Sequence, residues 1–150
     1  MYHNLFSKDC PFSLQLCDRY INNRHCNDVM VVAKQFFKKG EKISKLCGQI
    51  YPIEETYIKP GVNDFSLMVT QRNKLDLMFL GPISYVNHSC EANVIWNTQD
   101  KKTVNVKTIE NIKPGEEITA FYGNDYFNDG ECLCNHCYLN KRTTPASTLK

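Results

Sequence analysis

Short apolar stretches separated by turn residues recur along the chain, and most are rich in the β-branched and aromatic residues that favour strands. They lie at residues 29–37, 43–50, 65–70, 75–80, 94–97, 103–108 and 117–122. Turn residues return at intervals of about 8–12 residues, a spacing typical of all-β domains. No internal repeat of about 20–50 residues and no low-complexity segment breaks the pattern. We therefore predict a mostly β fold of small twisted sheets.

The turns between these stretches predict how the strands pair. We expect hairpins around the charged turn 38–42 and around residues 71–74 and 99–102. Lys113-Pro114-Gly115-Glu116 predicts a type I or II turn that leads into the last strand. The other expectations are irregular structure over 1–26, a turn or short helix at 52–56 and at 83–87, and a loose tail over 143–150.

The length and composition fit one globular domain. The chain has 150 residues, of which 42% are hydrophobic and 23% are charged, and a domain of this size can bury a substantial core. A net charge of +2 argues against binding nucleic acid by bulk charge alone. No apolar run reaches the ~18 residues of a membrane span, and residues 1–10 lack the apolar region of a signal peptide. We expect neither a membrane span nor secretion.

Cysteine is the first candidate for chemistry, because three of the eight cysteines, Cys132, Cys134 and Cys137, fall within six residues. Thiols this close cannot easily pair with one another in good disulfide geometry. They can converge on one zinc ion, which takes four tetrahedral thiolate or imidazole ligands. His136 or a distant cysteine can complete the set. The alternatives are buried free thiols, a redox C-x-x-C site, which lacks the usual βαβ pattern, and a secreted disulfide framework, which the missing signal peptide disfavours.

Two further motifs allow both a structural and a functional interpretation. Asn87-His88-Ser89-Cys90 contains a bare glycosylation pattern, and a single histidine here can equally be a hydrogen-bonded core residue. Residues 115–123 combine a turn, a strand and an aromatic end. Glu116 and Glu117 are adjacent and so point to opposite faces of a strand, which makes them poor candidates for a paired acid and base.

Together and in this order, the three motifs resemble those of SET-domain protein lysine methyltransferases that carry a post-SET zinc segment. The shared patterns are Asn-His-x-Cys at 87–90, Gly-Glu-Glu-Ile-x-x-x-Tyr-Gly at 115–123 and Cys-x-Cys-x-x-Cys at 132–137. Four more stretches are similar to the suppressor-of-variegation 4-20 branch, which methylates lysine-20 of histone H4: residues 17–20, 39–43, 61–66 and 80–82. The resemblance covers residues 17–137, most of the chain.

The resemblance implies a fold and a division of the chain. SET domains are small twisted β-sheets in which a C-terminal strand passes under an earlier segment to form a pseudoknot. The expected parts are an N-terminal extension at 1–16, the SET domain at 17–123, a post-SET zinc segment at 124–139 and a C-terminal tail at 140–150.

The resemblance also implies two bound groups, S-adenosyl-L-methionine as the methyl donor and one structural zinc ion. The residues expected to hold the methyl donor are Tyr20, Ile21, Asn22, Asn23, Val29, Arg72, Asn87, His88 and Leu133. Cys90 is the expected distant fourth zinc ligand, beside Cys132, Cys134 and Cys137. Such a zinc site would pin the C-terminal segment over the methyl donor, which couples metal binding to the folding of that wall.

Tyr122 matches the tyrosine that the family uses in catalysis. A lysine amine attacks only when it is neutral, so its ordinary pKa of about 10.4 must fall. An apolar channel and a nearby sulfonium charge both lower that pKa. Phe65, Ser66 and Phe121 are expected to line the channel with Tyr122, and Ser66 is expected to influence how many methyl groups are added. Methyl transfer then depends mainly on in-line positioning.

The resemblance implies a histone tail or nucleosome as partner, with H4 lysine-20 as the target, and a nuclear, chromatin-bound location. The alternatives are another histone or non-histone lysine, and a non-catalytic zinc-stabilised chromatin interaction module. Five lysines expected in one hairpin offer a weak DNA contact, unless they form only a solvated rim: Lys34, Lys38, Lys39, Lys42 and Lys45. Lys141-Arg142 is too short for a nuclear localisation signal, and the sequence indicates no oligomeric state.

Overall fold

Strands are the main regular elements of the described chain in the computed structural model. The described residues are 5–17, 28–53, 55–59, 67–69, 76–98, 102–124 and 132–143. The strands are β1 (Phe12–Cys17), β2 (Asp28–Ala33), β3 (Lys42–Pro52), β4 (Leu67–Val69), β5 (Asp76–Leu80), β6 (Asn87–His88), β7 (Val94–Thr98), β8 (Thr103–Thr108) and β9 (Thr119–Ala120). The labelled helices are the 3-10 helices η2 (Glu55–Tyr57) and η3 (Pro82–Tyr85) and the α-helix α1 (Asn135–Thr143). The expected mostly β fold is confirmed.

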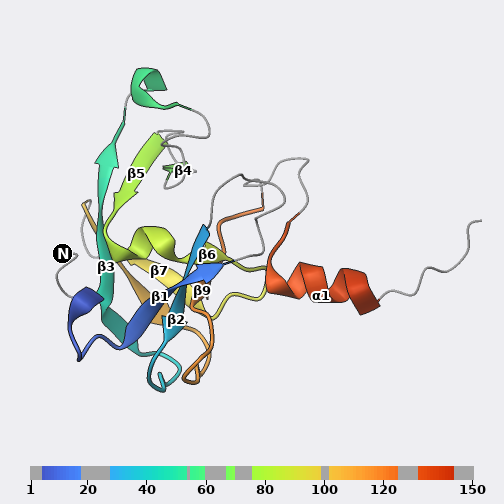
Figure 1. The fold of residues 1–150 in the computed structure, drawn as a ribbon. Coiled ribbons are helices and arrows are strands. Elements are labelled where there is room, and N and C mark those ends of the chain that lie inside the picture. Colours follow the sequence, from blue (N-terminus) through green and yellow to red (C-terminus); the bar gives the residue numbers. More distant parts are fainter. Residues whose placement is uncertain are drawn as a thin grey trace, which may run out of the picture.

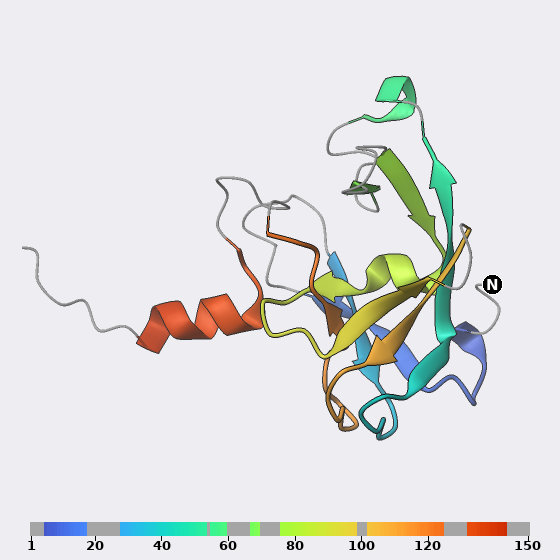
Figure 2. The same cartoon turned by 180° about the vertical axis from the view of Figure 1, so that it is seen from behind.

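Two sheets build the body of the molecule. β1 and β2 pair in a small antiparallel sheet, and the large sheet has the strand order β4-β5-β3-β8-β7-β9-β6. The long strand β3 pairs with β8 in the body, and its far end pairs with β5 in an arm that also carries η2 and β4 (Figure 1). Seen from behind, α1 projects from the body on the side opposite β3 (Figure 2). Helix α1 therefore lies beside the sheets and not between them.

The large sheet ends in a threaded arrangement. β9 lies between β6 and β7 and runs parallel to both, although β6 and β7 follow each other in the sequence. The segment between β6 and β7 wraps this strand, because the N–H groups of Ser89 and Asn93 donate to carbonyls of β9, each at 3.1 Å. This is the pseudoknot that the resemblance implies. β9 is shorter than the predicted strand 117–122, because Glu117 and Ile118 pair with β2 instead.

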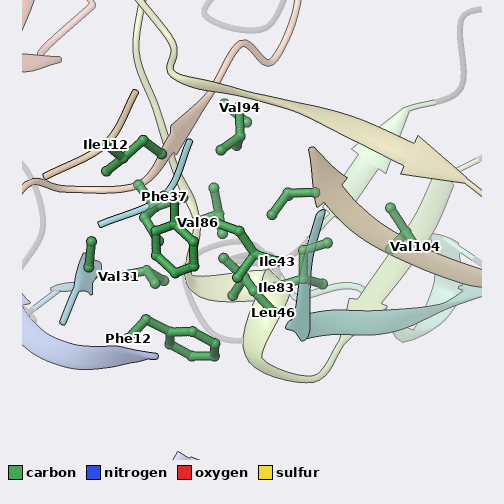
Figure 3. Close-up of a cluster of buried hydrophobic side chains, with 14 of the residues drawn as sticks. Phe12, Val31, Phe37, Ile43, Leu46, Ile83, Val86, Val94, Val104 and Ile112 are labelled. Carbon is green, nitrogen blue, oxygen red and sulfur yellow. The ribbon is translucent and has the colours of Figure 1, made fainter. Parts of the chain in front are cut away.

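One apolar cluster packs between the sheets and η3. Its fully buried side chains include Phe12, Val31, Phe37, Ile43, Leu46, Ile83, Val86, Val94, Val104 and Ile112 (Figure 3). β3 passes very close to η3 at Gly48, where an added Cβ would collide with the Ile83 side chain and the Leu80 carbonyl. A glycine at position 48 is therefore what allows the helix to cover the sheet this closely.

Two turns of the body repeat one geometry. Residues 38–41 and 113–116 share the pattern Lys-x-Gly-Glu, and their glycines have φ angles of 87° and 88°, as a type II turn requires at its third position. In each turn the glutamate N–H donates to the lysine carbonyl at 3.1 Å. The glutamate carboxylate in turn accepts the lysine N–H, at 3.0 Å in the first turn and 2.8 Å in the second.

The two turn segments are related by a local pseudo-twofold axis. Phe37 and Ile112 exchange two backbone hydrogen bonds of 2.9 Å at its centre. On either side, the last residue of β2 donates to the Glu116 carbonyl and the last residue of β8 donates to the Glu41 carbonyl, both at 2.9 Å. This repeat was not expected, because it is longer than the periods typical of repeat proteins.

The predicted hairpin around residues 38–42 is wrong. β2 ends at Ala33 rather than at 37 and pairs with β1, while β3 pairs with β5 and β8. The turn explains the difference, because a type II turn splays its flanking strands, whereas hairpins favour type I′ and II′ turns. The predicted basic hairpin therefore does not exist. Lys45 is half-buried and its Nζ donates to the Asp9 carbonyl at 2.9 Å.

The prediction for the N-terminal region is also wrong. Residues 12–17 were expected to be irregular but form β1, whose Leu14 lies opposite Val31 of β2. The signal was the alternation of Phe12, Leu14 and Leu16 with polar residues, which is the pattern of a half-buried strand. The pairing of this strand with β2 brings Phe12 into the core.

Most of the remaining local predictions agree with the structure, but the expected loose tail at 143–150 is not tested, because Thr143 ends α1 and residues 144–150 lie outside the described part of the chain. The hairpins β4–β5 and β7–β8 are antiparallel as expected, the turn at 113–116 is of type II, and η2 and η3 occupy the two expected short-helix positions. Helix α1 was not predicted, since residues 135–143 are mostly polar. Among the helices that the structure describes, none has the length and apolar character to cross a membrane.

Candidate functional site

Four cysteines from two distant parts of the chain meet where α1 begins. The Cys90 Sγ lies 3.8 Å from the Cys132 Sγ and 3.5 Å from the Cys137 Sγ. Cys134, just before the helix, accepts a hydrogen bond from the Cys137 N–H at 3.5 Å. All four are free thiols. The structure thus brings together the cysteine cluster of the C-terminal segment and the distant cysteine of the Asn-His motif.

These separations suit a tetrahedral metal site and not a disulfide. Four sulfurs at the usual Zn–S length of about 2.3 Å lie about 3.8 Å apart at the corners of a tetrahedron, whereas bonded sulfurs are about 2.0 Å apart. His136, the adjacent alternative ligand, lies instead against Glu91, with its Nδ1 3.0 Å from the carboxylate Oε2. The donor set and its spacing therefore fit zinc.

His88 is the other group near these thiols. Its Nε2 lies 3.5 Å from the Cys90 Sγ, and with Cys90, Cys132 and Cys134 it forms a set of possible ligand atoms within 4.8 Å of one another. Its Nδ1 accepts the Tyr122 N–H at 3.2 Å, so the neutral ring carries its proton on Nε2. A zinc-bound Nε2 would require that proton on Nδ1. The hydrogen bond from Tyr122 therefore favours four cysteines as the ligands.

The thiols differ in how readily they ionise. Burial raises the pKa of Cys90, and hydrogen bonds to Cys137 and Cys132 raise it further. Burial also raises the pKa of Cys132. At Cys134 burial acts in the same direction, but hydrogen bonds from the backbone of Cys90 and Cys137 outweigh it and lower the pKa to about 6. Cys134 is thus the first thiolate available to a cation, which binds deprotonated sulfur.

Tyr122 follows β9 and bonds back onto the pseudoknot. Its hydroxyl donates to the Val86 carbonyl at 2.5 Å, and its ring meets the His88 ring at 5.5 Å in an edge-on arrangement. Burial lowers the pKa of His88, so the imidazole is neutral at pH 7. His88 therefore behaves as the hydrogen-bonded core histidine that the sequence allowed, and it joins the tyrosine to the cysteine cluster.

Tyr122 also ends a row of aromatic rings that the motifs did not include. The Trp96 ring on β7 lies 6.2 Å from the Tyr122 ring and 5.4 Å from the Phe79 ring on β5. Strand alternation places Trp96 on the same face as the buried Val94, and this signal could have singled it out from the sequence. Phe121, an expected channel residue, is 44% exposed and lies 5.5 Å from the His88 ring.

The Asn87 side chain is held in one orientation. Its Nδ2 donates to the Val29 carbonyl at 3.0 Å and to the Glu117 Oε1 at 3.1 Å. Asn93 holds the same part of the knot, because its Nδ2 donates to the Glu117 carbonyl at 2.7 Å and its Oδ1 accepts the Thr119 N–H at 2.9 Å. The structure thus brings the predicted residues Asn87 and Val29 together, and Glu117 acts on the Asn87 amide rather than with Glu116.

A cavity of about 350 Å³ opens between the pseudoknot and α1. Its walls include His88, Glu117 and Thr119 from the knot and Glu91 and His136 from the segments around the cysteines. The volume lies within the range of about 300–1,000 Å³ that is usual for small-molecule sites. Two carboxylates in the wall suit a small molecule with positive charge.

The other predicted site residues divide into two groups. Leu133 is half-buried between the ligand candidates Cys132 and Cys134. Seven predicted residues lie outside the part of the chain that the structure describes: Tyr20, Ile21, Asn22, Asn23, Phe65, Ser66 and Arg72. Among the described residues expected to hold the methyl donor, His88 lines the cavity, whereas Val29, Asn87 and Leu133 do not.

Comparison with known families matches residues 28–123 to the SET domain. The chain belongs to the SET-domain family. The match ends at Gly123, so the pseudoknot and Tyr122 lie inside the SET domain and the cysteines at 132–137 follow it. The SET fold expected from the sequence is confirmed, and the cysteine cluster follows the matched region, which is consistent with a post-SET segment.

Curated relatives of this SET domain include longer proteins. The histone-lysine N-methyltransferase set9 of Schizosaccharomyces pombe is 38% identical over 141 residues, which are 91% of this chain and 31% of that protein. The set9 enzyme of Aspergillus terreus is 36% identical over 141 residues, 91% of this chain and 22% of that protein. The chain therefore spans less than a third of the length of these relatives.

Solved SET structures share the fold at low sequence identity. A Plasmodium falciparum protein assigned as a histone methyltransferase aligns with a TM-score of 0.53 and 19% identity, over 75% of this chain and 95% of that one. The methyltransferase domain of human PR domain-containing protein 2 aligns with a TM-score of 0.50 and 19% identity, over 84% of this chain and 86% of that one. At this identity the likeness concerns the fold alone.

Proposed function

We propose that this SET domain is an S-adenosyl-L-methionine-dependent histone-lysine N-methyltransferase, and that its target is lysine-20 of histone H4. The observation that carries the proposal is the position of Tyr122, which the pseudoknot holds beside Asn87 and His88. The relatives named as histone-lysine N-methyltransferases support the histone class. The similarity of four stretches to the suppressor-of-variegation 4-20 branch supports the choice of lysine.

The proposed site of S-adenosyl-L-methionine is the cavity beside His88. This molecule carries a sulfonium and an ammonium group against one carboxylate, so carboxylates of Glu91 and Glu117 in the wall complement its charge. When bound, it supplies an electrophilic methyl group. Asn87, Val29 and Leu133 do not line this cavity, and they are proposed to support its walls, Asn87 through its hydrogen bond to the Glu117 carboxylate. The segments expected to complete the site are Tyr20, Ile21, Asn22, Asn23 and Arg72.

The proposed ligands of one structural zinc ion are Cys90, Cys132, Cys134 and Cys137. The ion would tie the segment after Gly123 to the pseudoknot. His136 and Leu139 of α1 line the cavity, so the same tie holds one wall of the proposed cofactor site. Metal binding and formation of that wall are then coupled.

Tyr122 is the proposed catalytic residue. Its hydroxyl donates to Val86, and a phenol oxygen that donates one hydrogen bond can also accept one. An amine N–H of the substrate lysine that donates to this oxygen is held with its lone pair in a defined direction. Most of the acceleration then comes from alignment of the amine with the methyl group rather than from acid–base chemistry.

The proposed lysine channel is aromatic. The wall residues expected from the sequence are Phe65, Ser66 and Phe121. We add Trp96, because its ring contacts the Tyr122 ring. Such walls exclude water and so lower the pKa of the entering ammonium group. They also tolerate the positive charge of a methylated product.

The proposed partner is a histone tail or nucleosome. The proposed location is the nucleus, where the protein would act on chromatin. The competing function is a non-catalytic zinc-stabilised chromatin module. The intact arrangement of Asn87, His88 and Tyr122 favours the enzyme, because a module that only binds does not need a hydroxyl and an amide fixed at this point.

The test is methyl transfer to recombinant nucleosomes, with each histone tail mapped by mass spectrometry. We expect methyl groups on H4 lysine-20 alone. Tyr122→Phe removes one oxygen and keeps the ring contacts, so we expect a rate at least about 10²-fold lower, as for a loss of reactant alignment. Ser66→Ala is expected to change the proportion of mono-, di- and trimethylated product.

Tyr138→Phe is the matched control, because it removes the same oxygen from an exposed tyrosine of α1, and it should retain the full rate. Methylation of a different lysine would refute the proposed target and keep the reaction. A protein that binds the methyl donor but methylates neither nucleosomes nor free histones would favour the non-catalytic module.

A further inference from the structure

One end of the body carries a concentration of positive charge that the proposed reaction does not use. The two Lys-x-Gly-Glu turns lie side by side there, at the end farthest from η2 (Figures 1 and 2). Six exposed lysines form what we call the basic tip: Lys34, Lys38, Lys39, Lys42, Lys107 and Lys113. Three exposed glutamates accompany them, Glu41, Glu110 and Glu116, which leaves the tip at +3 in a chain of net charge +2.

The acidic groups of the tip do not neutralise its lysines. The carboxylates of Glu41 and Glu116 are turned onto the backbone N–H groups of their own turns, at 3.0 and 2.8 Å. Within the described residues, none of the six ammonium groups takes part in an ion pair. The ammonium groups therefore point their charge at the solvent.

The strand register adds a second observation. Lys42 of β3 lies directly opposite Lys107 of β8, and both are exposed. Like charges directly opposite each other destabilise an antiparallel pair. An anion placed over Lys42 and Lys107 would remove this repulsion, so the register itself indicates a negatively charged partner at this end.

We propose that the basic tip binds the phosphate backbone of double-stranded DNA. Phosphate contacts from lysine give affinity without sequence preference. An acidic protein partner fits less well, because protein interfaces are depleted in lysine and enriched in arginine, methionine and aromatic residues. All six cations of the tip are lysines, and Phe36 is the exposed aromatic residue among them.

This contact differs from the one expected from the sequence. Lys45 is not part of it, since its Nζ is bonded to Asp9, and Lys107 and Lys113 are added from the second half of the pseudo-twofold repeat. In the context of the proposed function, the tip would hold nucleosomal DNA while the Tyr122 site receives a histone tail. The DNA binding itself does not depend on that function.

The test is fluorescence anisotropy of a short labelled DNA duplex of arbitrary sequence, titrated with the complete chain at several salt concentrations. The logarithm of the binding constant should fall linearly with the logarithm of the salt concentration, by about 0.9 for each phosphate contact. Replacing three lysines of the turns together, Lys38→Gln, Lys39→Gln and Lys113→Gln, should reduce this slope by about two to three. Affinity at low salt should fall about tenfold or more.

The matched control changes the same amount of charge outside the tip. This control combines Lys8→Gln, Lys59→Gln and Lys102→Gln, and it should leave both the salt dependence and the affinity of DNA binding unchanged. Lys102, for example, precedes the first residue of β8, whereas Lys107 lies near its last residue. Equal losses in the two triple variants, or absence of DNA binding, would overturn the proposal. Polyglutamate bound as tightly as DNA would overturn it in favour of an acidic protein partner.

Methylation of a free histone H4 peptide separates this proposal from the proposed function. The Lys38/Lys39/Lys113 variant should methylate the peptide at the wild-type rate while binding DNA poorly. A wild-type protein that binds DNA through the tip but methylates no histone would refute the enzyme and leave the DNA contact standing. A protein that methylates the peptide but whose DNA binding ignores the tip would refute the contact alone.

Discussion

At the scale of single residues, the site depends on hydrogen bonds that link parts with separate roles. His88 accepts the Tyr122 N–H with one ring nitrogen and approaches the Cys90 thiol with the other. The position of a proton on that ring therefore connects the proposed catalytic tyrosine with the proposed zinc site. The motifs predicted that both residues matter, but the choice of Nε2 as the protonated nitrogen follows from a contact with Tyr122, 34 positions later in the chain.

Gly48 is a residue whose missing side chain sets the distance between β3 and η3. Gly48→Ala should lower the free energy of unfolding by about 1–3 kcal/mol, because the added methyl group overpacks against Ile83 and the Leu80 carbonyl. Urea denaturation measures this difference.

Gly115→Asn serves as the control for the loss of a glycine. No atom lies within 4 Å of an added Cβ at that position, and asparagine tolerates a positive φ angle better than other side chains. Its effect should be smaller than that of Gly48→Ala. Equal stability of Gly48→Ala and the wild type would show that η3 moves away from β3 at little cost.

At the scale of elements, helix α1 depends on the cysteine cluster at its first turn. Cys137→Ser removes one of four proposed ligands, and we expect zinc affinity to fall by more than the 10–100-fold that loss of an outer-shell partner costs. The wild type should hold one zinc per chain by elemental analysis. A chelator should remove it together with the helical circular dichroism of α1.

Cys47→Ser is the matched control for this prediction, since Cys47 is a half-buried free thiol on β3 outside the cluster. It should retain the full zinc content. Full zinc content in Cys137→Ser, together with its loss in a His88→Ala variant, would show instead that the histidine is the fourth ligand.

The two Lys-x-Gly-Glu turns have the same geometry, so the contribution of each to stability can be compared with that of the other. Glu41→Gln and Glu116→Gln each weaken one charge-assisted hydrogen bond to a turn N–H. Because the bonds are exposed, each substitution should cost about 0.5–1.5 kcal/mol of unfolding free energy. The two costs should be nearly equal, because the geometry is the same. Urea denaturation of both variants checks this, and a large difference would show that the turns share a shape but not a role in stability.

At the scale of the whole molecule, the pseudoknot and α1 form two walls of one cavity, so a ligand there should stabilise the entire fold. S-adenosyl-L-methionine at a free concentration of 100 times its Kd should add about 2.7 kcal/mol to the free energy of unfolding. For a chain of this size that corresponds to a rise of about 5–10 °C in Tm. Differential scanning fluorimetry of the zinc-loaded protein measures the shift.

The same measurement on Asn87→Ala tests where the methyl donor binds. This variant loses the amide that bridges Val29 and Glu117, and its shift should be much smaller at the same concentration. A full shift in Asn87→Ala would place the methyl donor away from the knot, and no shift in the zinc-loaded wild type would contradict the proposed cofactor.

The sequence by itself determined most of the strands, two of the three predicted hairpins, the presence of the 113–116 turn and membership of the SET family. These depend on short stretches, in which alternation, turn residues and motif spacing act locally. The convergence of the cysteines at 132–137 was also predictable, because the ligand spacing lies within one segment.

Only the tertiary structure decided which strands are partners and which side chains meet. β2 pairs with β1 because the type II turn after Phe37 directs β3 elsewhere. The ring contact of Trp96 with Tyr122, the proton position on His88 and the joining of two lysine-bearing turns into one basic tip all bring together residues far apart in the sequence. Such contacts depend on how the whole chain packs, and local sequence patterns carry no information about them.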